Sequence, residues 1–378
     1  MRVLVAPDKF RGTLTARQAT EAIASGWRRV RPNDELDLAP MADGGEGTMV
    51  TLVDALGGQL VRSRVSGPLG DGVEAAFGLA EEGLGRIAIV EMAAASGLHL
   101  LDQSRHDPRR TTTRGTGELM LHALDHEPKE VIVGLGGSAT NDGGAGMAQA
   151  LGVRLLDATG AELRPGGAAL INLARIDATA IDPRLSRVRC VAATDVDNPL
   201  TGWRGASVIY GPQKGADPDD VALLDRALGH LAAVVHRDLG LDLREEPGAG
   251  AAGGLGFGLM AFLGAHVRSG IDVVAEALDL PERLGHADLA ITGEGRVDAQ
   301  SLHGKVPAGV VRLARERSIP TVILCGEAER ELPELEVPVW SLVERFGRDE
   351  ASGDARRCLD TLAAETAARA DDFSRWSR

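Results

Sequence analysis

The feature that most constrains this chain is a repeated order of a short apolar run, a loop with glycine or an acidic residue, and an amphipathic segment. It opens the chain, where residues 2–6 (RVLVA) precede a helix pattern that starts at Thr15 and a second apolar run at 35–39. It returns at residues 287–327. Parallel strands need such crossovers. We therefore predict an α/β protein with a doubly wound, mainly parallel sheet of the Rossmann or flavodoxin type.

The middle of the chain has a different pattern, and 378 residues exceed what one hydrophobic core usually serves. Residues 59–92 consist of short alternating runs separated by glycine-rich turns, which predicts an antiparallel meander. We predict two domains. Residues 1–66 and 286–378 form the doubly wound domain, and residues 67–285 form an inserted α/β domain that carries the glycine-rich loop 134–146.

Charge and cysteine content exclude several classes of protein. A net charge of -14 argues against binding to nucleic acid or an anionic membrane surface, although not against a small anionic substrate. The three cysteines are widely separated, which is typical of a reduced protein without metal-thiolate sites. The sequence contains neither a signal-peptide pattern nor an apolar run of about 20 residues. We expect a cytoplasmic protein that acts on small molecules.

Polar residues follow five of the predicted strands. Ligands of open α/β sheets bind beyond the carboxyl ends of the strands. One such loop alone is typical of a solvated turn, whereas five together favour a shared ligand cleft. Acidic side chains that converge on a cleft repel each other, so a divalent cation is implied, and Mg²⁺ suits hard oxygen ligands. The five loops carry Asp8 and Lys9; Asp43, Glu46 and Thr48; Ser138, Asn141 and Asp142; Asp195, Asp197 and Asn198; and Glu294, Arg296 and Asp298.

Residues 131–146 (VIVGLGGSATNDGGAG) combine an apolar strand pattern with a glycine-rich loop that permits two interpretations. Residues 134–139 match the GxGxxA dinucleotide fingerprint, and Asp157 lies about where a ribose-binding acid would stand. Against this, residues 140–144 would form the first helical turn, and their glycine pair weakens a helix. The dinucleotide interpretation stays open beside the second one.

The second interpretation is a phosphate-binding turn. The backbone N–H groups of Gly136, Gly137 and Ser138, at a helix start, would form a nest for a phosphate. Asn141 and Asp142 would reach the phosphate or its metal ion. The residues of the loop favour this triphosphate interpretation.

Cations for the phosphates must come from outside a P-loop, because no GxxxxGK[ST] signature occurs. Lys9, Lys214 and Lys305 lie in loops flanked by glycine or proline, and together we interpret them as ligand-binding. Residues 248–253 (GAGAAG) form a second glycine-rich match, interpreted as a hinge or a close approach of backbone to ligand. Further candidate cations are Arg11, Arg114 and Arg296.

Taken together, these loops resemble those of the bacterial class I glycerate kinases. The resemblance is carried by VAPDKFRGTLTA, PMADGGEGT, GLGGSATNDGGAG, TDVDNPLTG, YGPQKGA, GAGAAGGLGFGL and ITGEGRVDAQSLHGK, in the family's order over nearly the full length. Lys9 and Arg11 depart from the family pattern, which often has serine followed by lysine there. The resemblance implies ATP-dependent phosphorylation of D-glycerate with Mg²⁺, in a cleft between two α/β domains, one inserted into the other. Members of this class generally give 2-phospho-D-glycerate, and a 3-kinase is the alternative.

Residue roles follow from what phosphoryl transfer needs, which is alignment and neutralisation of charge. Asp195 is our candidate for the base that accepts the hydroxyl proton, with Asp197 second. Lys214 and Arg296 lead for contact with the substrate carboxylate or the transferring phosphoryl group. The remaining assignments are Gly136, Gly137, Ser138, Asn141 and Asp142 for ATP; Asp8, Lys9, Asn198 and Lys305 for substrate; and Asp43, Glu46 and Glu294 for Mg²⁺.

Two functions of other classes stay open. One is a nicotinamide-dependent oxidoreductase that uses the dinucleotide fingerprint and Asp157. The other is a non-catalytic sensor of small acids. The oligomeric state also stays open, a homodimer being one option.

Overall fold

A computed structural model describes residues 1–10, 12–82, 85–298, 305–329 and 336–373; the candidate cation Arg11 lies outside the described residues. The chain forms two compact units, Met1–Asp43 with Ser269–Arg378, and Gly44–Arg268. Each unit contains a sheet with parallel strands and covering helices, which confirms the predicted α/β class. Among the described residues, no helix has the length and apolar character to cross a membrane.

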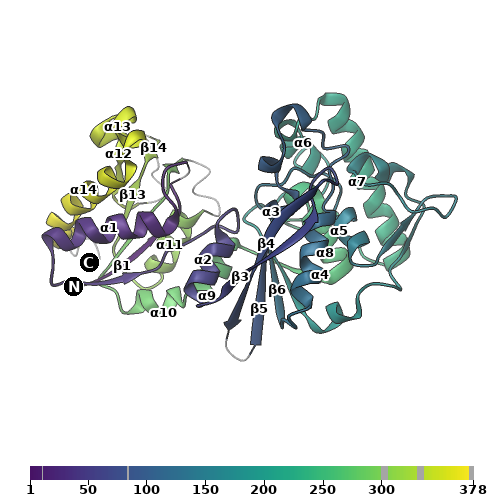
Figure 1. Ribbon diagram of the computed structural model, residues 1–378. Helices are drawn as coiled ribbons and strands as arrows, with labels where there is room; N and C mark the ends of the chain where they lie inside the picture. Colours follow the sequence, from purple (N-terminus) through teal and green to yellow (C-terminus); the bar gives the residue numbers. More distant parts are fainter. Residues whose placement is uncertain (11, 83–84, 299–304, 330–335, 374–378) are drawn as a thin grey trace. The chain divides into compact units, whose positions relative to one another are not determined.

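The first unit contains a five-stranded, fully parallel sheet in the order β15-β13-β11-β1-β2 (Figure 1). This is the flavodoxin-like order, with the first strand of the chain second from one edge. Val3, Leu4 and Val5 of β1 are all fully buried, as expected for a strand covered on both faces. The strands are β1 (Arg2–Pro7), β2 (Glu35–Leu38), β11 (Leu289–Gly293), β13 (Thr321–Cys325) and β15 (Val339–Ser341), with the separate pair β12 (Arg296–Val297) and β14 (Glu327–Ala328).

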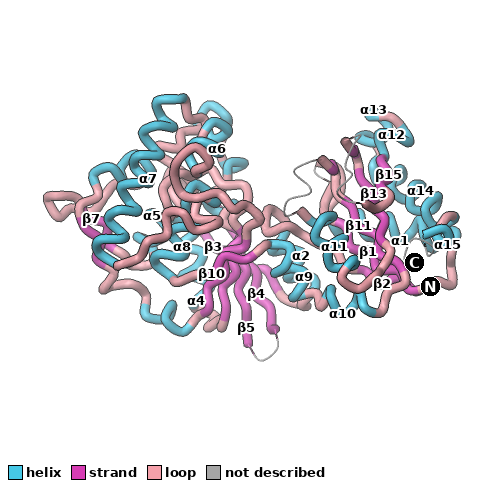
Figure 2. Tube along the Cα trace, turned by 180° about the vertical axis from the view of Figure 1, so that it is seen from behind, coloured by secondary structure: helices cyan, strands magenta, loops and turns pink. Residues whose placement is uncertain are grey.

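Helices cover both faces of this sheet. On β13, Val322 and Leu324 share a core with α1 and α14, whereas Ile323 and Cys325 pack with α11 on the other face (Figures 1 and 2). The alternation follows from the two-residue period of a strand. The helices are α1 (Ala16–Val30), α9 (Gly270–Ala277), α10 (Leu280–Gly285), α11 (Val306–Arg315), α12 (Leu342–Phe346), α13 (Arg348–Gly353), α14 (Ala355–Ala368) and α15 (Ala370–Phe373).

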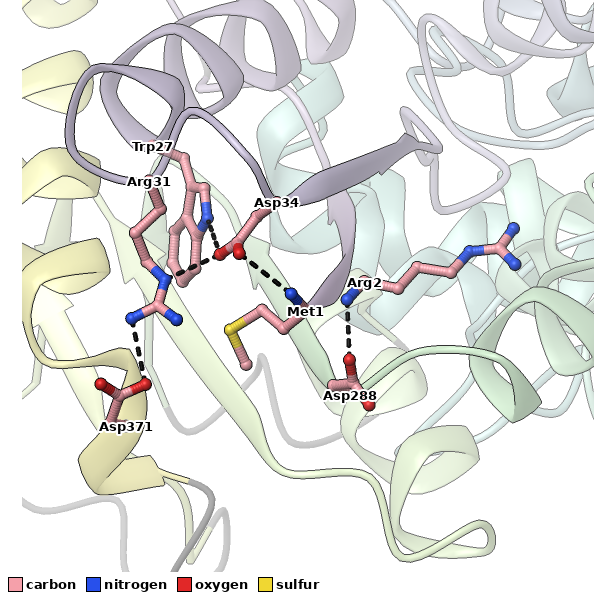
Figure 3. Close-up of polar contacts among 7 residues, drawn as sticks. All are labelled: Met1, Arg2, Trp27, Arg31, Asp34, Asp288 and Asp371. Carbon is pink, nitrogen blue, oxygen red and sulfur yellow. Dashed lines mark hydrogen bonds and ion pairs between the residues drawn. The ribbon is translucent and has the colours of Figure 1, made fainter.

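Asp34 links the end of α1 to the start of β1 through hydrogen bonds and an ion pair (Figure 3). One carboxylate oxygen accepts hydrogen bonds from the Trp27 indole at 3.1 Å and the Arg31 guanidinium at 2.8 Å, and the other contacts the Met1 amine at 2.9 Å. Arg31 also reaches Asp371 at 3.0 Å. Burial alone would raise the pKa of Asp34, but these donors outweigh it and hold the pKa below its usual value.

The second unit contains a six-stranded mixed sheet in the order β10-β9-β6-β5-β4-β3. The first four strands in this order are parallel, and β5, β4 and β3 pair antiparallel, which confirms the meander predicted for residues 59–92. The strands are β3 (Gln59–Ser66), β4 (Gly72–Glu82), β5 (Gly85–Glu91), β6 (Glu130–Gly134), β9 (Arg189–Ala193) and β10 (His266–Arg268), with the separate antiparallel pair β7 (Arg154–Leu156) and β8 (Arg175–Asp177).

Helices of the second unit pack around this sheet and around one another. They are α2 (Thr48–Ala55), α3 (Ala93–Ser96), α4 (Arg114–Leu124), α5 (Ala145–Ala150), α6 (Ala206–Tyr210), α7 (Pro218–Leu239) and α8 (Ala251–Leu263), with the 3₁₀ turn η5 (Pro212–Lys214). In α7 the buried Leu224, Leu228 and Leu231 form one face, as the periodicity of its sequence predicts.

The compact units end at 43/44 and 268/269, whereas the sequence analysis sets domain boundaries at 66/67 and 285/286. The difference has a local cause at each end. At the first boundary, β3 pairs with β4 along its whole length and so belongs to the second unit. At the second boundary, α9 and α10 pack against α11 and so belong to the first unit. The domain division itself stays a prediction.

Candidate functional site

Asp8 and Glu294 lie at the carboxyl end of the first unit's sheet, immediately after the neighbouring strands β1 and β11. Pro7 pairs with Gly293, and the Asp8 N–H donates to the Gly293 carbonyl at 2.8 Å, so the register brings the two acids together. In flavodoxin-like sheets this pair of strands is the point where the winding reverses and ligands bind.

The carboxylate of Asp8 is enclosed in an acidic setting. Only 5% of the residue is exposed. Burial, and then the negative charges of Asp43 and Glu294, raise its pKa to about 7, although the Lys9 N–H donates to it at 2.6 Å. The Lys305 ammonium lies 3.6 Å from Glu294. The carboxylates of Asp8, Asp43 and Glu294 thus outnumber the lysines near them, Lys9 and Lys305, a setting that favours a cation.

The other predicted residues of this unit lie nearer the surface. Lys305 also contacts Asp298 at 3.8 Å, and the exposed Arg296 lies 3.5 Å from Asp298 and 3.8 Å from Glu329. Among the described residues, no three His, Cys, Asp or Glu side chains form a group that could hold a metal ion by themselves.

The second unit has its own row of strand ends. Glu91, Gly134, Ala193 and Arg268 are register partners across the four parallel strands, so the loops that follow β6 and β9 begin side by side. The strands that precede the five polar loops belong to two sheets: β1, β2 and β11 to the first, β6 and β9 to the second. The loop after β2 crosses the boundary between the units, with Asp43 in the first and Glu46 and Thr48 in the second. The prediction that all five share one cleft stays a prediction.

Glu91 is a residue that the sequence analysis does not single out. Its carboxylate accepts hydrogen bonds from the N–H groups of Gly47 at 2.9 Å and Met49 at 2.8 Å. It thereby caps α2, whose own N-terminal residue is a glycine without a side-chain acceptor. The sequence does show an acidic residue at the end of an apolar strand. Its role as a helix cap could not be predicted from this, because the N–H groups that it binds are 42 and 44 residues away.

The glycine turn at residues 136–138 is held on both sides by backbone. The Leu98 N–H donates to the Gly137 carbonyl and the Ala139 N–H to the Ser96 carbonyl, both at 2.9 Å. A Cβ on Gly136 would lie 2.6 Å from Cα of Gly45, so only glycine fits there. Helix α5 begins only at Ala145, so the turn precedes the helix, whereas the sequence analysis sets it at the helix start.

The backbone N–H groups of this turn have no hydrogen-bond acceptor within the described part of the chain. Among the described residues, the N–H groups of Gly136, Gly137 and Ser138 make no hydrogen bond. Gly137 is exposed and has a φ of +75°, the left-handed conformation that glycine adopts readily. Consecutive N–H groups of this kind form an anion-binding concavity.

The features that support a dinucleotide fingerprint do not occur together. Gly134 lies inside β6, and α5 starts nine residues after Gly136. Asp157 occupies a tight turn directly after β7, where its carboxylate accepts hydrogen bonds from Thr159 N at 2.8 Å and Ala161 N at 3.1 Å. The acid thus stabilises its own turn, and the structure gives the oxidoreductase alternative no support.

Asn141 and Asp142 point into the unit. Asp142 is fully buried and accepts hydrogen bonds from the N–H groups of Thr113, Gly144 and Gly146 at 2.8, 3.2 and 3.2 Å, and from the Thr113 hydroxyl at 3.0 Å. Burial raises its pKa against the effect of these donors. The Asn141 amide donates to the Ser207 hydroxyl at 2.9 Å. Both side chains therefore hold the loop from within.

The second glycine-rich segment, residues 248–253, brings backbone against this same loop. A Cβ on Gly253 would collide with the carbonyl oxygen of Thr140, and the Gly143 N–H donates to the Gly253 carbonyl at 3.0 Å. Positive φ values at Ala252, Gly253 and Gly254 kink α8 to allow the approach. The sequence analysis predicts a hinge or an approach to ligand at this segment, whereas the close approach in the structure is to the protein's own backbone.

Lys214 lies beneath the same loop. Its side chain is 1% exposed, and its ammonium donates to the Thr140 carbonyl at 2.6 Å. Burial lowers the pKa of Lys214 to about 7, against the opposing effect of the Asp142 charge. The side chain that the sequence analysis assigns to substrate or phosphoryl contact is thus enclosed by protein.

The loop after β9 carries Asp195, Asp197 and Asn198 in different settings. Asp195 is half-buried next to the strand end. Asp197 is exposed and lies 2.9 Å from Arg204. The Asn198 amide accepts from the Tyr210 hydroxyl at 2.7 Å and donates to the Arg204 carbonyl at 2.8 Å, which ties the loop to α6.

Comparison with known proteins places the chain in a family. The model of the glycerate kinase family matches residues 3–370. A glycerate kinase of Bacillus subtilis is 50% identical over 331 residues, which cover 88% of this chain and 86% of the relative. A protein of Escherichia coli K12 named glycerate 2-kinase is 48% identical over 326 residues, 86% of this chain and 85% of the relative. A crystal structure from Salmonella typhimurium LT2, provisionally described as glycerate kinase 2, has a TM-score of 0.88 and 43% identity and covers 99% of both chains. The resemblance seen in the sequence is confirmed: the chain belongs to the glycerate kinase family and is a kinase.

Proposed function

We propose that this enzyme transfers the terminal phosphoryl group of ATP to the 2-hydroxyl of D-glycerate, giving 2-phospho-D-glycerate and ADP. Family membership supports glycerate as the acceptor, and the 48% identity to a protein named glycerate 2-kinase favours the 2-hydroxyl over the 3-hydroxyl. The observation in the structure that carries the proposal is the turn at 136–138, whose three N–H groups make no hydrogen bond among the described residues.

The turn is our proposed binding site for ATP phosphates. Backbone N–H groups hold a phosphate without a basic side chain, which fits a kinase that lacks a P-loop. Ser138 lies in the same turn, while Asn141 and Asp142 stabilise the loop from the buried side. Their contribution to ATP binding is therefore indirect.

Asp195 is our proposed general base, because a half-buried carboxylate beside a strand end can accept the proton of an attacking hydroxyl. Asp197 is second, since it is exposed and paired with Arg204. Of the two leading cations, Arg296 is exposed and suited to ligand contact, whereas Lys214 is enclosed. Lys9 and Lys305 remain proposed substrate contacts; the Asn198 amide is engaged at both ends within the protein.

Mg²⁺ is the proposed metal ion, held in the first unit by Asp43 and Glu294 beside Asp8, with Glu46 as a further proposed ligand. The chemistry of the donors suits Mg²⁺, because carboxylate oxygens are its preferred ligands. Asp43 and Glu294 lie near enough to Asp8 that their charges, after burial, raise its pKa. Mg²⁺ keeps several water ligands, so it does not require a complete protein cage. When bound, the ion neutralises the negative charge of the phosphates.

The reaction itself is tested by a product assay. The enzyme is incubated with ATP, Mg²⁺ and D-glycerate, and the product is coupled to enolase either alone or together with phosphoglycerate mutase. We expect a signal with enolase alone, since only the 2-phosphate is its substrate. A signal that requires the mutase would identify a 3-kinase, and ATP that stays intact despite tight glycerate binding would indicate a small-acid sensor.

The metal site is tested by Glu294→Gln. We expect the Mg²⁺ concentration for half-maximal activity to rise by about 10–100-fold, the usual cost of losing a group that supports a metal ion. Binding of Mn²⁺ to the protein without substrate, followed by electron paramagnetic resonance, should weaken in parallel. Glu282→Gln is the matched control, an exposed acid in α10 of the same unit. Equal metal affinity in both variants would exclude Glu294 as a ligand.

A further inference from the structure

We propose that Lys214 is a positioning residue, whose ammonium group holds the Thr140 carbonyl and thereby keeps the turn at 136–138 in its phosphate-binding shape. The inference rests on the proposed function for the role of the turn, and it assigns the lysine a part that needs no contact with ATP or glycerate.

The GPQKGA segment is built to direct this side chain inward. Lys214 ends the 3₁₀ turn η5, which Pro212 opens and which the Lys214 N–H closes by donating to the Gly211 carbonyl at 2.9 Å. Gly215 follows with a φ of +94°, and a Cβ there would lie 2.7 Å from the His106 carbonyl. The backbone therefore reverses directly after the lysine, and its side chain enters the interior.

Three consecutive residues of the glycine-rich loop are each held by a different element. Thr140 is held by Lys214 of η5, and Asn141 by Ser207 of α6. Asp142 is held by Thr113, the residue that precedes α4. The first of these three anchored residues, Thr140, comes two residues after the end of the turn at 136–138. A phosphate nest held in advance binds its anion without the entropic cost of ordering the loop.

Packing alone does not account for a lysine at this position. Burying an ammonium group is costly even when it is hydrogen-bonded, and an apolar side chain of similar length would fill the same space. Burial lowers the pKa of Lys214 to about 7, which reflects that cost. What an apolar side chain cannot supply is the short hydrogen bond that directs the Thr140 carbonyl. The lysine therefore contributes orientation to the loop.

The test compares Lys214→Met with the wild-type enzyme. We expect KM for ATP to rise at least about tenfold and KM for D-glycerate to change less than about twofold, because the turn serves only the nucleotide. Amide hydrogen exchange at residues 135–144, measured without any ligand, should become at least about tenfold faster as the loop loses its anchor. In Lys214→Ala, added ethylamine should restore part of the ATP affinity by supplying an ammonium group in the cavity.

Two control variants separate positioning from general damage. Phe77→Leu weakens the core of the same unit away from the loop, and Lys129→Met removes an exposed lysine. Neither should alter KM for ATP. Unchanged exchange at 135–144 in Lys214→Met, or failure of both Lys214 variants to fold, would overturn the proposal. A wild-type enzyme that leaves ATP and D-glycerate unreacted would overturn the proposed function instead, while the exchange experiment would still decide whether Lys214 anchors the loop.

Discussion

Asp195→Asn is expected to lower kcat by roughly 10²–10⁴-fold, the usual contribution of a general base. Asparagine keeps the shape of the side chain but cannot accept the hydroxyl proton. Asp195 follows β9, and the last residue of β9 is the register partner of the last residues of β6 and β10. The loop that carries Asp195 therefore begins beside the loop that carries the phosphate turn. Steady-state kinetics with saturating ATP and D-glycerate would measure the effect, and circular dichroism should show an unchanged fold.

Asp197→Asn is the matched control for that experiment. It changes a carboxylate two residues away that is exposed and paired with Arg204, and such surface ion pairs contribute at most about 1 kcal/mol. We expect its kcat to stay within about threefold of the wild type, in keeping with so small a contribution. Near-normal turnover of Asp195→Asn would remove this residue as the base, and a large loss in Asp197→Asn alone would transfer the role to Asp197.

The fold of the first unit could be predicted because its signals are local. Parallel strands covered on both faces appear as uninterrupted apolar runs, as at residues 2–6, and Thr15 and Gln18 form the capping box that starts α1. In the second unit, the antiparallel pairing of β3, β4 and β5 could be predicted for the same reason, because short turns join these consecutive strands.

The distribution of the strands between two sheets could not be predicted in the same way. β1 pairs with β11 across more than 280 residues, whereas β6 pairs with β5 and β9 in the other unit. Apolar runs of the same kind occur in both sheets, and only long-range packing decides which strands become neighbours. The expected polar loops are present, but they belong to two sheet edges.

Side-chain direction was the part of the site least accessible to sequence reasoning. A polar residue after a strand can face a ligand or its own loop. Asn141, Asp142 and Lys214 face inward because Ser207, Thr113 and the Thr140 carbonyl, all distant in sequence or in another element, offer them partners. Glycine was the better guide, since Gly136 and Gly253 both mark places where two backbones meet.

Gly253→Ala should destabilise the protein by about 2–5 kcal/mol, one of the largest effects expected of a single added methyl group. Part of this cost is the left-handed conformation at a φ of +69°, which disfavours alanine by about 1–2 kcal/mol. The rest comes from overpacking, typically about 1–3 kcal/mol, because the new Cβ would collide with the Thr140 carbonyl. Denaturant unfolding would measure the loss of free energy, and KM for ATP should rise as the displaced carbonyl leaves Lys214.

Gly264→Ala isolates the steric part of that effect. Gly264 ends the same helix with a φ of +61°, so alanine meets nearly the same backbone strain, but no atom lies within 4 Å of the added Cβ. We expect this variant to lose only about 1–2 kcal/mol and to keep its KM for ATP. Because the backbone cost is shared, the difference between the two variants measures how firmly α8 presses on the loop. If both variants lost the same free energy of unfolding and had the same KM for ATP, the loop would move aside without cost. In that case neither α8 nor Lys214 would hold the loop in place.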